Sequence, residues 1–147
     1  MARPTSRHPT ELELQILKIL WACGTPCSVR QVQQMLRDQG KDLAYTSVIT
    51  MLNIMTRKRY LTRKKDRNAT AGGGGYVYQP RISQQSTTTR MLKDLVDRVF
   101  GGSAMDLVVQ LLDQKDLDPH ELKELRALID RAATDEKRQA PPRKGGI

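Results

Sequence analysis

The chain has 147 residues, a net charge of +9 and a pI of about 9.9. This length fits one domain or two very small ones, and 38% apolar but only 4% aromatic residues predict a core of aliphatic and methionine side chains. There is no run of about 18 apolar residues, which excludes a membrane-spanning helix, and the opening MARPTSRHPT lacks the apolar segment of a secretion signal.

The positive charge is concentrated in the N-terminal part of the chain. Residues 1–82 contain 14 Lys and Arg against 5 Asp and Glu, residues 83–132 contain 7 against 9, and residues 133–147 contain 4 against 2. A basic surface of this kind favours a polyanion, either nucleic acid or an anionic membrane surface. We therefore expect the first 82 residues to bind the polyanion and the middle segment to have a different task.

Two helices with clear start signals are predicted in the first forty residues. Thr10 is followed by Glu13, and Ser28 by Gln31, at the spacing of a capping box. Apolar residues follow each start at helical spacing. Glycine and proline end the first helix, and Gly40 ends the second because glycine tolerates a positive φ.

A third helix is predicted over residues 44 to 58, and its two faces differ in chemistry. On a helical wheel Val48, Met51, Leu52 and Met55 share one apolar face. The opposite face has short polar groups and one guanidinium, from Thr46, Thr50, Asn53 and Arg57. Three residues lie at the edges between the two faces: Ser47, Ile49 and Ile54. A merely solvated face is usually rich in Glu and Lys, whereas residues 43–65 contain no carboxylate. Asn can bond adenine, Thr can reach bases or phosphates, and an apolar group can touch a thymine methyl.

The segments YLTRKK and YVYQP are predicted strands, joined by a loop whose glycine run at residues 72–75 is expected to be flexible. Three helices and a hairpin are the order of a winged helix-turn-helix, in which the third of these helices enters the major groove. Basic residues at the helix end and along the hairpin are expected to meet phosphates: Arg57, Lys58, Arg59, Arg63, Lys64, Lys65 and Arg67. The alternative is a solubilising charge run. Arg30 is either a further phosphate contact or a solvated side chain.

Residues 86–132 are predicted to form three short amphipathic helices without catalytic groups. Three such helices make a thin core, which favours a homodimer, although a second core within one chain is the alternative. The apolar residues expected at the dimer contact are Met91, Leu92, Leu95, Val99, Leu107, Val108, Leu111, Leu112, Leu122, Leu125 and Ile129. Residues 1–8 and the polar residues 133–147 are predicted to be disordered tails.

No enzyme signature is found, so we expect no catalysis, no cofactor and no metal. His8 lies in the predicted tail, and His120 follows a helix N-cap, where it is expected to be solvated. Cys23 and Cys27 do not have a zinc spacing and have no second ligand pair; in a reducing cytosol they are expected to be plain thiols. The glycines at 72–75 lack the Lys-Ser/Thr of a phosphate loop.

Over residues 9–132 the chain resembles the BlaI/MecI/CopY family of penicillinase and methicillin-resistance repressors. The segments that carry the resemblance are TELELQILKILW, SVRQVQQML, LAYTSVITMLNIM, YVYQP and GGSAMDLVVQLLDQKDLDPHELKELRALID. It implies a homodimer whose winged helix, residues 9–82, binds a palindromic operator in double-stranded DNA. It also implies a helical dimerisation domain over residues 86–132, and makes YTSVITMLN the recognition segment, with Thr46, Ser47, Thr50 and Asn53 among its contacts.

In the antibiotic-responsive members of this family, the metalloprotease activity of a membrane sensor leads to cleavage in the dimerisation domain. The resemblance places that bond near Gln110–Leu111. No cysteine follows Cys27, so the C-terminal cysteine pairs of the copper-responsive branch are absent. Two further departures are Arg59, where members commonly have glycine, and Ile54, where some have arginine.

The sequence thus predicts a mostly α-helical protein with a small β-hairpin, in the cytoplasm and not inserted in a membrane, that acts as a dimeric transcriptional repressor. Two alternatives stay open. The winged helix could bind a partner protein in place of DNA, or the protein could bind DNA as an autonomous regulator without a protease partner.

Overall fold

The computed structural model describes residues 8–67 and 75–139, which divide into two compact units at the bond between Asp94 and Leu95. Helix α4 crosses this boundary. In chain order the elements are α1 (Glu11–Cys23), β1 (Cys27–Ser28), α2 (Val29–Asp38), α3 (Tyr45–Arg57), β2 (Leu61–Lys65), β3 (Tyr76–Pro80), α4 (Gln84–Val99), α5 (Ala104–Asp113) and α6 (Pro119–Gln139).

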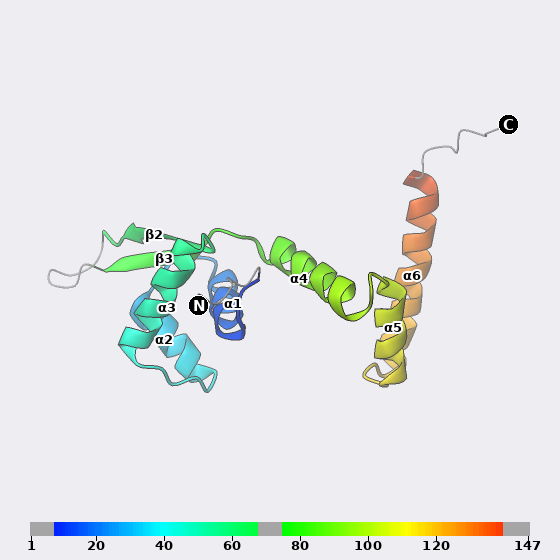
Figure 1. Cartoon of the computed structure of the whole chain (residues 1–147), viewed down its shortest axis with the longest axis horizontal. Helices are drawn as coiled ribbons and strands as arrows, with labels where there is room; N and C mark the ends of the chain where they lie inside the picture. Colours follow the sequence, from blue (N-terminus) through cyan, green and yellow to red (C-terminus); the bar gives the residue numbers. More distant parts are fainter. Residues whose placement is uncertain (1–7, 68–74, 140–147) are drawn as a thin grey trace. The chain divides into compact units, whose positions relative to one another are not determined.

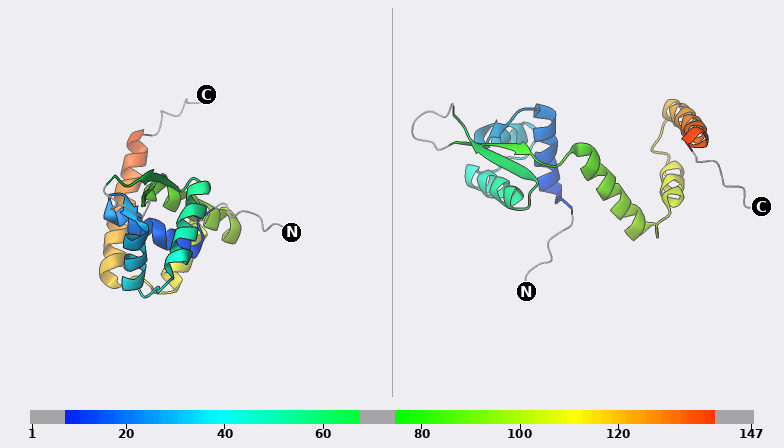
Figure 2. Two further views of the ribbon diagram at one scale, coloured as in Figure 1. Left: turned by 90° about the vertical axis from the view of Figure 1, so that its left-hand side faces the viewer. Right: turned by 90° about the horizontal axis from the view of Figure 1, so that it is seen from above.

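The first unit has the order of elements of a winged helix-turn-helix. Helices α1, α2 and α3 are grouped together, and the β2–β3 hairpin, called the wing below, lies beside α3 (Figures 1 and 2). The sheet is antiparallel in the order β1-β3-β2. The mostly helical fold with a small β-hairpin is therefore confirmed, with a third short strand added to the hairpin.

The core of this unit is built almost entirely from aliphatic side chains, as the composition predicts. Its fully buried members come from α1, α2, α3 and the strands of the sheet, and Tyr78 is the largest of them. Trp21, at the edge of this core, donates its indole N–H to the carbonyl of Ile82 at 3.0 Å. This bond ties the end of α1 to the segment that follows the wing.

Both predicted capping boxes are confirmed. The backbone N–H of Glu13 donates to Oγ1 of Thr10, and the N–H of Thr10 donates back to Oε1 of Glu13 at 2.9 Å. Ser28 and Gln31 make the same reciprocal pair at the start of α2. Each box satisfies two amides that a helix start would otherwise leave without an acceptor.

The end of α3 is held by a partly buried ion pair that could not be seen in the sequence pattern. Glu13 is 1% exposed, and the Lys58 ammonium lies 2.9 Å from its Oε2 and donates to both carboxylate oxygens. Lys58 is therefore engaged by α1, which corrects its grouping with the basic residues expected to meet phosphates. A buried carboxylate needs such a partner because its desolvation is costly.

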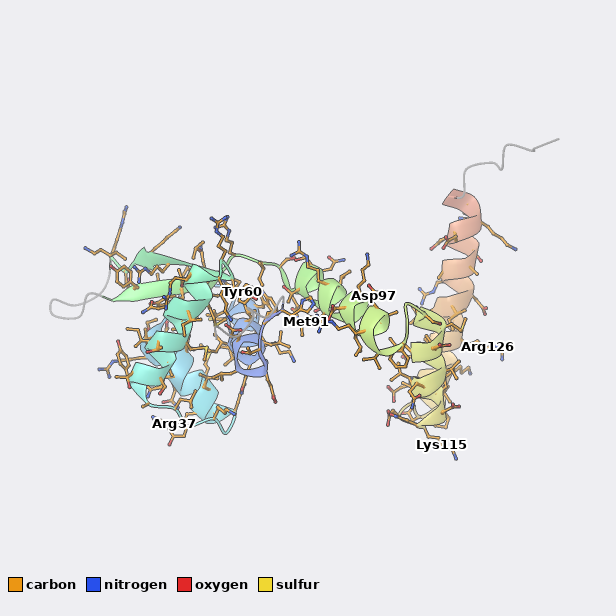
Figure 3. The ribbon with its side chains drawn as sticks, viewed as in Figure 1. Arg37, Tyr60, Met91, Asp97, Lys115 and Arg126 are labelled. Atoms are coloured by element: carbon orange, nitrogen blue, oxygen red, sulfur yellow. The ribbon has the colours of Figure 1, made fainter. Side chains whose placement is uncertain are left out.

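Arg59, directly after this pair, has a φ of +67°. Its N–H donates to the carbonyl of Thr56, and the N–H of Tyr60 donates to that of Met55, which together form a Schellman motif with Arg59 in the left-handed position. Tyr60 (labelled in Figure 3) begins the turn into β2. The glycine expected here by resemblance is thus replaced by a side chain that must adopt a glycine-like backbone.

Three expectations about the chain ends and elements need correction or fall outside the described residues. Helix α6 continues to Gln139, so residues 133–139 are helical and do not belong to a disordered tail. His8, which was expected in a disordered tail, lies against α4 with its Nε2 3.5 Å from Oδ2 of Asp94. It is therefore part of the ordered structure. Residues 1–7, 140–147 and most of the glycine run, residues 72–74, lie outside the described part of the chain.

The second unit consists of the end of α4 and the helices α5 and α6, which run in opposite directions (Figure 1). Lys115, with a φ of +56°, stands in the turn between them (Figure 3). Ser103 caps α5, and Asp118 and Glu121 make reciprocal backbone–side-chain bonds at the start of α6. His120 is exposed, with Nε2 3.0 Å from Glu124. In the described residues no helix combines the length and the apolar character needed to cross a membrane.

Candidate nucleic-acid interface

The outer face of α3 is exposed and carries short polar side chains, as its pattern predicts. Thr46, Ser47 and Thr50 are exposed, as is Arg57, and Ile49 and Asn53 are half-buried. The Thr50 hydroxyl donates to the carbonyl of Thr46 at 2.7 Å, so its oxygen is left as an acceptor toward the outside. The N-cap residue Ala44 makes no side-chain capping bond, which leaves the first amides of α3 for solvent or an anion.

Asn53 connects this face to both strands of the wing. Its Oδ1 accepts a hydrogen bond from the Tyr78 hydroxyl at 2.9 Å and another from Nη1 of Arg63 at 3.3 Å. Because a guanidinium can only donate, the atom facing Arg63 must be the amide oxygen. Burial raises the pKa of Tyr78, so its hydroxyl keeps the proton that it donates. Asn53 is therefore a junction between α3, β2 and β3.

Arg63 is also held by an aromatic ring. Its guanidinium carbon lies 4.5 Å from the centroid of the Tyr76 ring, within cation–π range. With one contact to Asn53 and one to Tyr76, this exposed side chain has a defined direction. A pre-positioned guanidinium loses less conformational entropy when it binds an anion.

The wing residues divide between the two faces of the sheet. Side chains alternate along a strand, and Arg63 lies opposite Tyr78 while Lys65 lies opposite Tyr76. Arg63 and Lys65 therefore share the face that meets α3, and Lys64, opposite Val77, lies on the other face. All three are exposed, as is Arg67 after the strand. The structure thus separates basic residues that the sequence presents as one run.

A shallow hollow of about 460 Å³ lies where α3 meets the wing, lined by Asn53, Thr56, Arg57 and Arg63. Two of these four residues are arginines, and none of the four is acidic. A second basic group lies at the other end of α3, where the guanidinium carbon of Arg30 is 5.8 Å from the ring centroid of exposed Tyr45. Arg30 is thereby placed beside the uncapped helix start.

Most of the residues predicted to bind DNA therefore lie on three elements: the start of α2, α3 and β2. Helix α3 packs against each of the other two. The tyrosines at positions 45, 76 and 78 are the members that the sequence analysis missed. The alternation in YVYQP was a usable signal, because it puts Tyr76 and Tyr78 on one face of a strand. Among the described residues, no group of three or more His, Cys, Asp or Glu side chains could hold a metal ion.

The apolar residues expected at a dimer contact are mostly uncovered in the single chain. Met91, Leu107 and Leu125 are half-buried. The other eight are exposed: Leu92, Leu95, Val99, Val108, Leu111, Leu112, Leu122 and Ile129. Helix α5 has no buried residue at all. Gln110 and Leu111, the predicted cleavage bond, lie inside α5 and are exposed.

The chain is similar to known proteins in sequence and in fold. A family model described as penicillinase repressor matches residues 9–131. The methicillin resistance regulatory protein MecI of Staphylococcus aureus strain N315 is 21% identical over 119 residues, which cover 81% of this chain and 90% of MecI. MecI of Mammaliicoccus sciuri is 20% identical over the same shares. Among solved structures, a mutant of MarR from E. coli complexed with operator DNA matches at a TM-score of 0.45 and 16% identity, covering 84% of this chain and 74% of MarR.

The fold and the exposed polar helix face beside a basic wing define the class of winged-helix DNA-binding proteins. Within that class, the chain belongs to the penicillinase repressor family, whose model spans most of its length. It is therefore a DNA-binding transcriptional repressor, and the resemblance seen in the sequence is confirmed.

Proposed function

We propose that the protein is a homodimeric repressor that binds a palindromic operator through α3 and the wing. The observation that carries the proposal is the junction at Asn53, which joins the polar face of α3 to Arg63 and Tyr78 of the wing. This junction fixes the helix and the wing as one surface. Arg30, Thr46, Ser47, Ile49, Thr50, Arg57, Lys65 and Arg67 complete the proposed surface, and Lys64 lies on the opposite face of the wing.

Different parts of this surface have different tasks. The exposed side chains near the start of α3, Thr46, Ser47 and Thr50, are the ones that reach base edges in the major groove, with Ile49 offering an apolar contact to thymine. The arginines at the hollow and the uncapped start of α3 bind phosphates, which position the helix without reading sequence. Because Oδ1 of Asn53 already accepts two hydrogen bonds, we assign Asn53 to positioning Arg63 as well as to contact with DNA.

Dimerisation is supported by the apolar surface of the second unit. Leu95, Val99, Leu122 and Ile129 are each at least 41% exposed, and α5 buries none of its residues. A single chain would leave this surface in water, whereas a second copy would cover it. Two copies related by a two-fold axis would also present two α3 helices to two half-sites, which matches a palindromic operator.

Relief of repression by cleavage is the further part of the proposal. The bond Gln110–Leu111 lies in a helix, and a protease must first open a helix locally to bind an extended segment. Because α5 has no buried side chain of its own, local opening depends on how firmly the partner subunit holds it. Cutting there would remove the end of α5 and all of α6 from the chain that carries the DNA-binding unit.

Selection of operator DNA from a pool of random duplexes by the full-length protein tests this function. We expect the recovered sequences to share two inverted half-sites about one helical turn apart, and the affinity to fall steeply as salt rises. Recovery of single half-sites would contradict the dimeric proposal. Failure to retain any duplex, even at low salt, would favour a winged helix that binds a partner protein.

Co-expression with a membrane sensor metalloprotease encoded beside the gene, if such a neighbour exists, tests the cleavage. A fragment ending at Gln110 that appears only in induced cells supports the proposal. An intact chain in induced cells identifies an autonomous regulator without a protease partner.

A further inference from the structure

The two cysteines of the chain are in contact, although their spacing does not form a metal site. Cys23 is the last residue of α1 and Cys27 the first residue of β1. Gly24 between them has a φ of +71°, which reverses the chain at the end of the helix. As a result the two Sγ atoms lie 3.0 Å apart, and the Cys27 thiol donates a hydrogen bond to Sγ of Cys23.

The surroundings of the two thiols differ in a way that separates their roles. Cys23 is exposed, whereas Cys27 is fully buried and lies in β1 opposite Tyr78 of β3. A reagent from solvent can therefore reach Cys23 and not Cys27. The strand holds Cys27 in place beside its partner, so no large movement is needed for the two sulfurs to meet.

The hydrogen bonds at this pair favour a thiolate at the exposed position. The Cys27 thiol, and after it the Thr25 hydroxyl, which lies 3.5 Å from Sγ of Cys23, lower the pKa of Cys23. Burial raises the pKa of Cys27 to about 12, so Cys27 keeps its proton and remains a donor. An accessible cysteine with a lowered pKa beside a second, buried thiol is the arrangement of an oxidation-sensitive cysteine with its resolving partner.

We propose that Cys23 and Cys27 form a dithiol that hydroperoxides oxidise to an intramolecular disulfide. In the first step the Cys23 thiolate attacks one peroxide oxygen, the O–O bond breaks, and the departing oxygen takes up a proton to leave as water or an alcohol. Cys23 becomes a sulfenic acid. In the second step Sγ of Cys27 attacks the sulfenic sulfur, the S–O bond breaks, and the leaving hydroxide takes the Cys27 proton to form water.

The electrons balance without a further reactant, because the two thiols lose two electrons and the hydroperoxide gains two. The geometry requires the sulfur atoms to close from 3.0 Å to about 2.05 Å. The test of the dithiol measures only thiols and protein mass, so it does not depend on the proposed operator.

Intact-mass measurement of the full-length protein after titration with hydrogen peroxide tests the site. Wild type should lose two hydrogens and both free thiols, gain no oxygen, and return to its starting mass with dithiothreitol. Cys27→Ala should gain one oxygen on Cys23 and react with a dicarbonyl sulfenic-acid probe. Cys23→Ser, which changes an exposed residue, should keep its buried thiol unmodified at the same peroxide dose.

Peptide mapping of the oxidised wild type places the cross-link without relying on a variant that has to fold. A Cys23–Cys27 cross-linked peptide from the monomeric band supports the proposal. Both thiols surviving peroxide, a disulfide between two chains, or oxidation of Cys27 in Cys23→Ser at the wild-type rate would each overturn it.

Discussion

Arg59 has a backbone conformation that favours glycine. It occupies the left-handed position of the Schellman motif that ends α3, with a φ of +67°. A non-glycine residue in this region costs about 1 kcal/mol relative to glycine, part of which the greater chain entropy of unfolded glycine offsets. Arg59→Gly should therefore stabilise the first unit by roughly 0.5–1 kcal/mol, measured by urea unfolding followed through fluorescence of Trp21, the single tryptophan.

Arg59→Ala is the matched control for this change, because it removes the same charge and keeps the Cβ atom. It should leave the unfolding midpoint near that of the wild type. Equal stabilisation by both variants would show that relief of charge repulsion, and not the backbone, is responsible.

Asn53 and Tyr78 should depend on each other for stability. The Tyr78 hydroxyl belongs to a fully buried residue and donates to Oδ1 of Asn53. Asn53→Ala would leave that hydroxyl without this acceptor, at a cost of about 1–3 kcal/mol. Tyr78→Phe in the Asn53→Ala background removes the stranded donor, so the double variant should recover part of the loss, which a double-mutant cycle of urea unfolding measures. Strict additivity of the two changes would contradict a direct bond.

Asn53 also shows which features of a single residue can be predicted from the sequence and which cannot. The helical wheel correctly predicts that Asn53 belongs to the polar face of α3. It cannot predict that Tyr78 and Arg63 reach Asn53, because that contact depends on how the wing packs on the helix. Lys58 is a similar case, since its charge suggests phosphate binding until α1 brings the Glu13 carboxylate to 2.9 Å.

At the scale of the element, the two faces of the wing should differ in their contribution to DNA binding. Lys65 shares the face of Arg63 toward α3, and its neighbour Lys64 lies on the opposite face. Lys65→Gln should lower the slope of log K against log salt by up to about 0.9, the value for one lost phosphate contact. Lys64→Gln removes the same charge from a position that is also exposed and is the matched control.

Fluorescence anisotropy with a random-sequence duplex is sufficient for this comparison, because phosphate contacts are independent of sequence. A smaller change in slope is expected for Lys64→Gln. Identical slopes for the two variants would mean that only total charge matters and that the face of the wing is irrelevant.

Elements with strong local signals were predictable, and those that depend on partners were not. The capping boxes mark α1 and α2 correctly because both partners lie within four residues of each other in the sequence. Strand β1 has two residues and forms only through its pairing with β3. Its local sequence therefore has no pattern from which a strand could be predicted. The extension of α6 through TDEKRQ lacks an apolar stripe, but most of these residues are good helix formers.

For the whole molecule, the apolar periodicity predicts the helices of the second unit but not what covers them. Leu95, Leu112 and Ile129 satisfy the pattern of a buried face and are nevertheless exposed in the single chain. A helical wheel treats a core within one chain and a contact between two chains alike. The exposed fractions of these side chains favour a contact between two chains. The oligomeric state is therefore the property to measure.

A fragment of residues 1–83 should fold and remain monomeric. The buried hydrophobic cluster and its packing partners lie between Leu12 and Ile82, so removal of the later helices leaves that core complete and takes away the exposed apolar surface. On a palindromic operator the proposed dimer would place its second α3 at high effective concentration. The fragment should lose that gain and bind about 10²–10⁴-fold more weakly, with the same preference for one half-site.

Sedimentation velocity of the fragment measures its oligomeric state, and a titration of full and half operators measures its affinity. A dimeric fragment, or one that binds the full operator as tightly as the intact chain, would place the dimer contact in the winged helix and remove the physical basis for relief of repression by cleavage in α5.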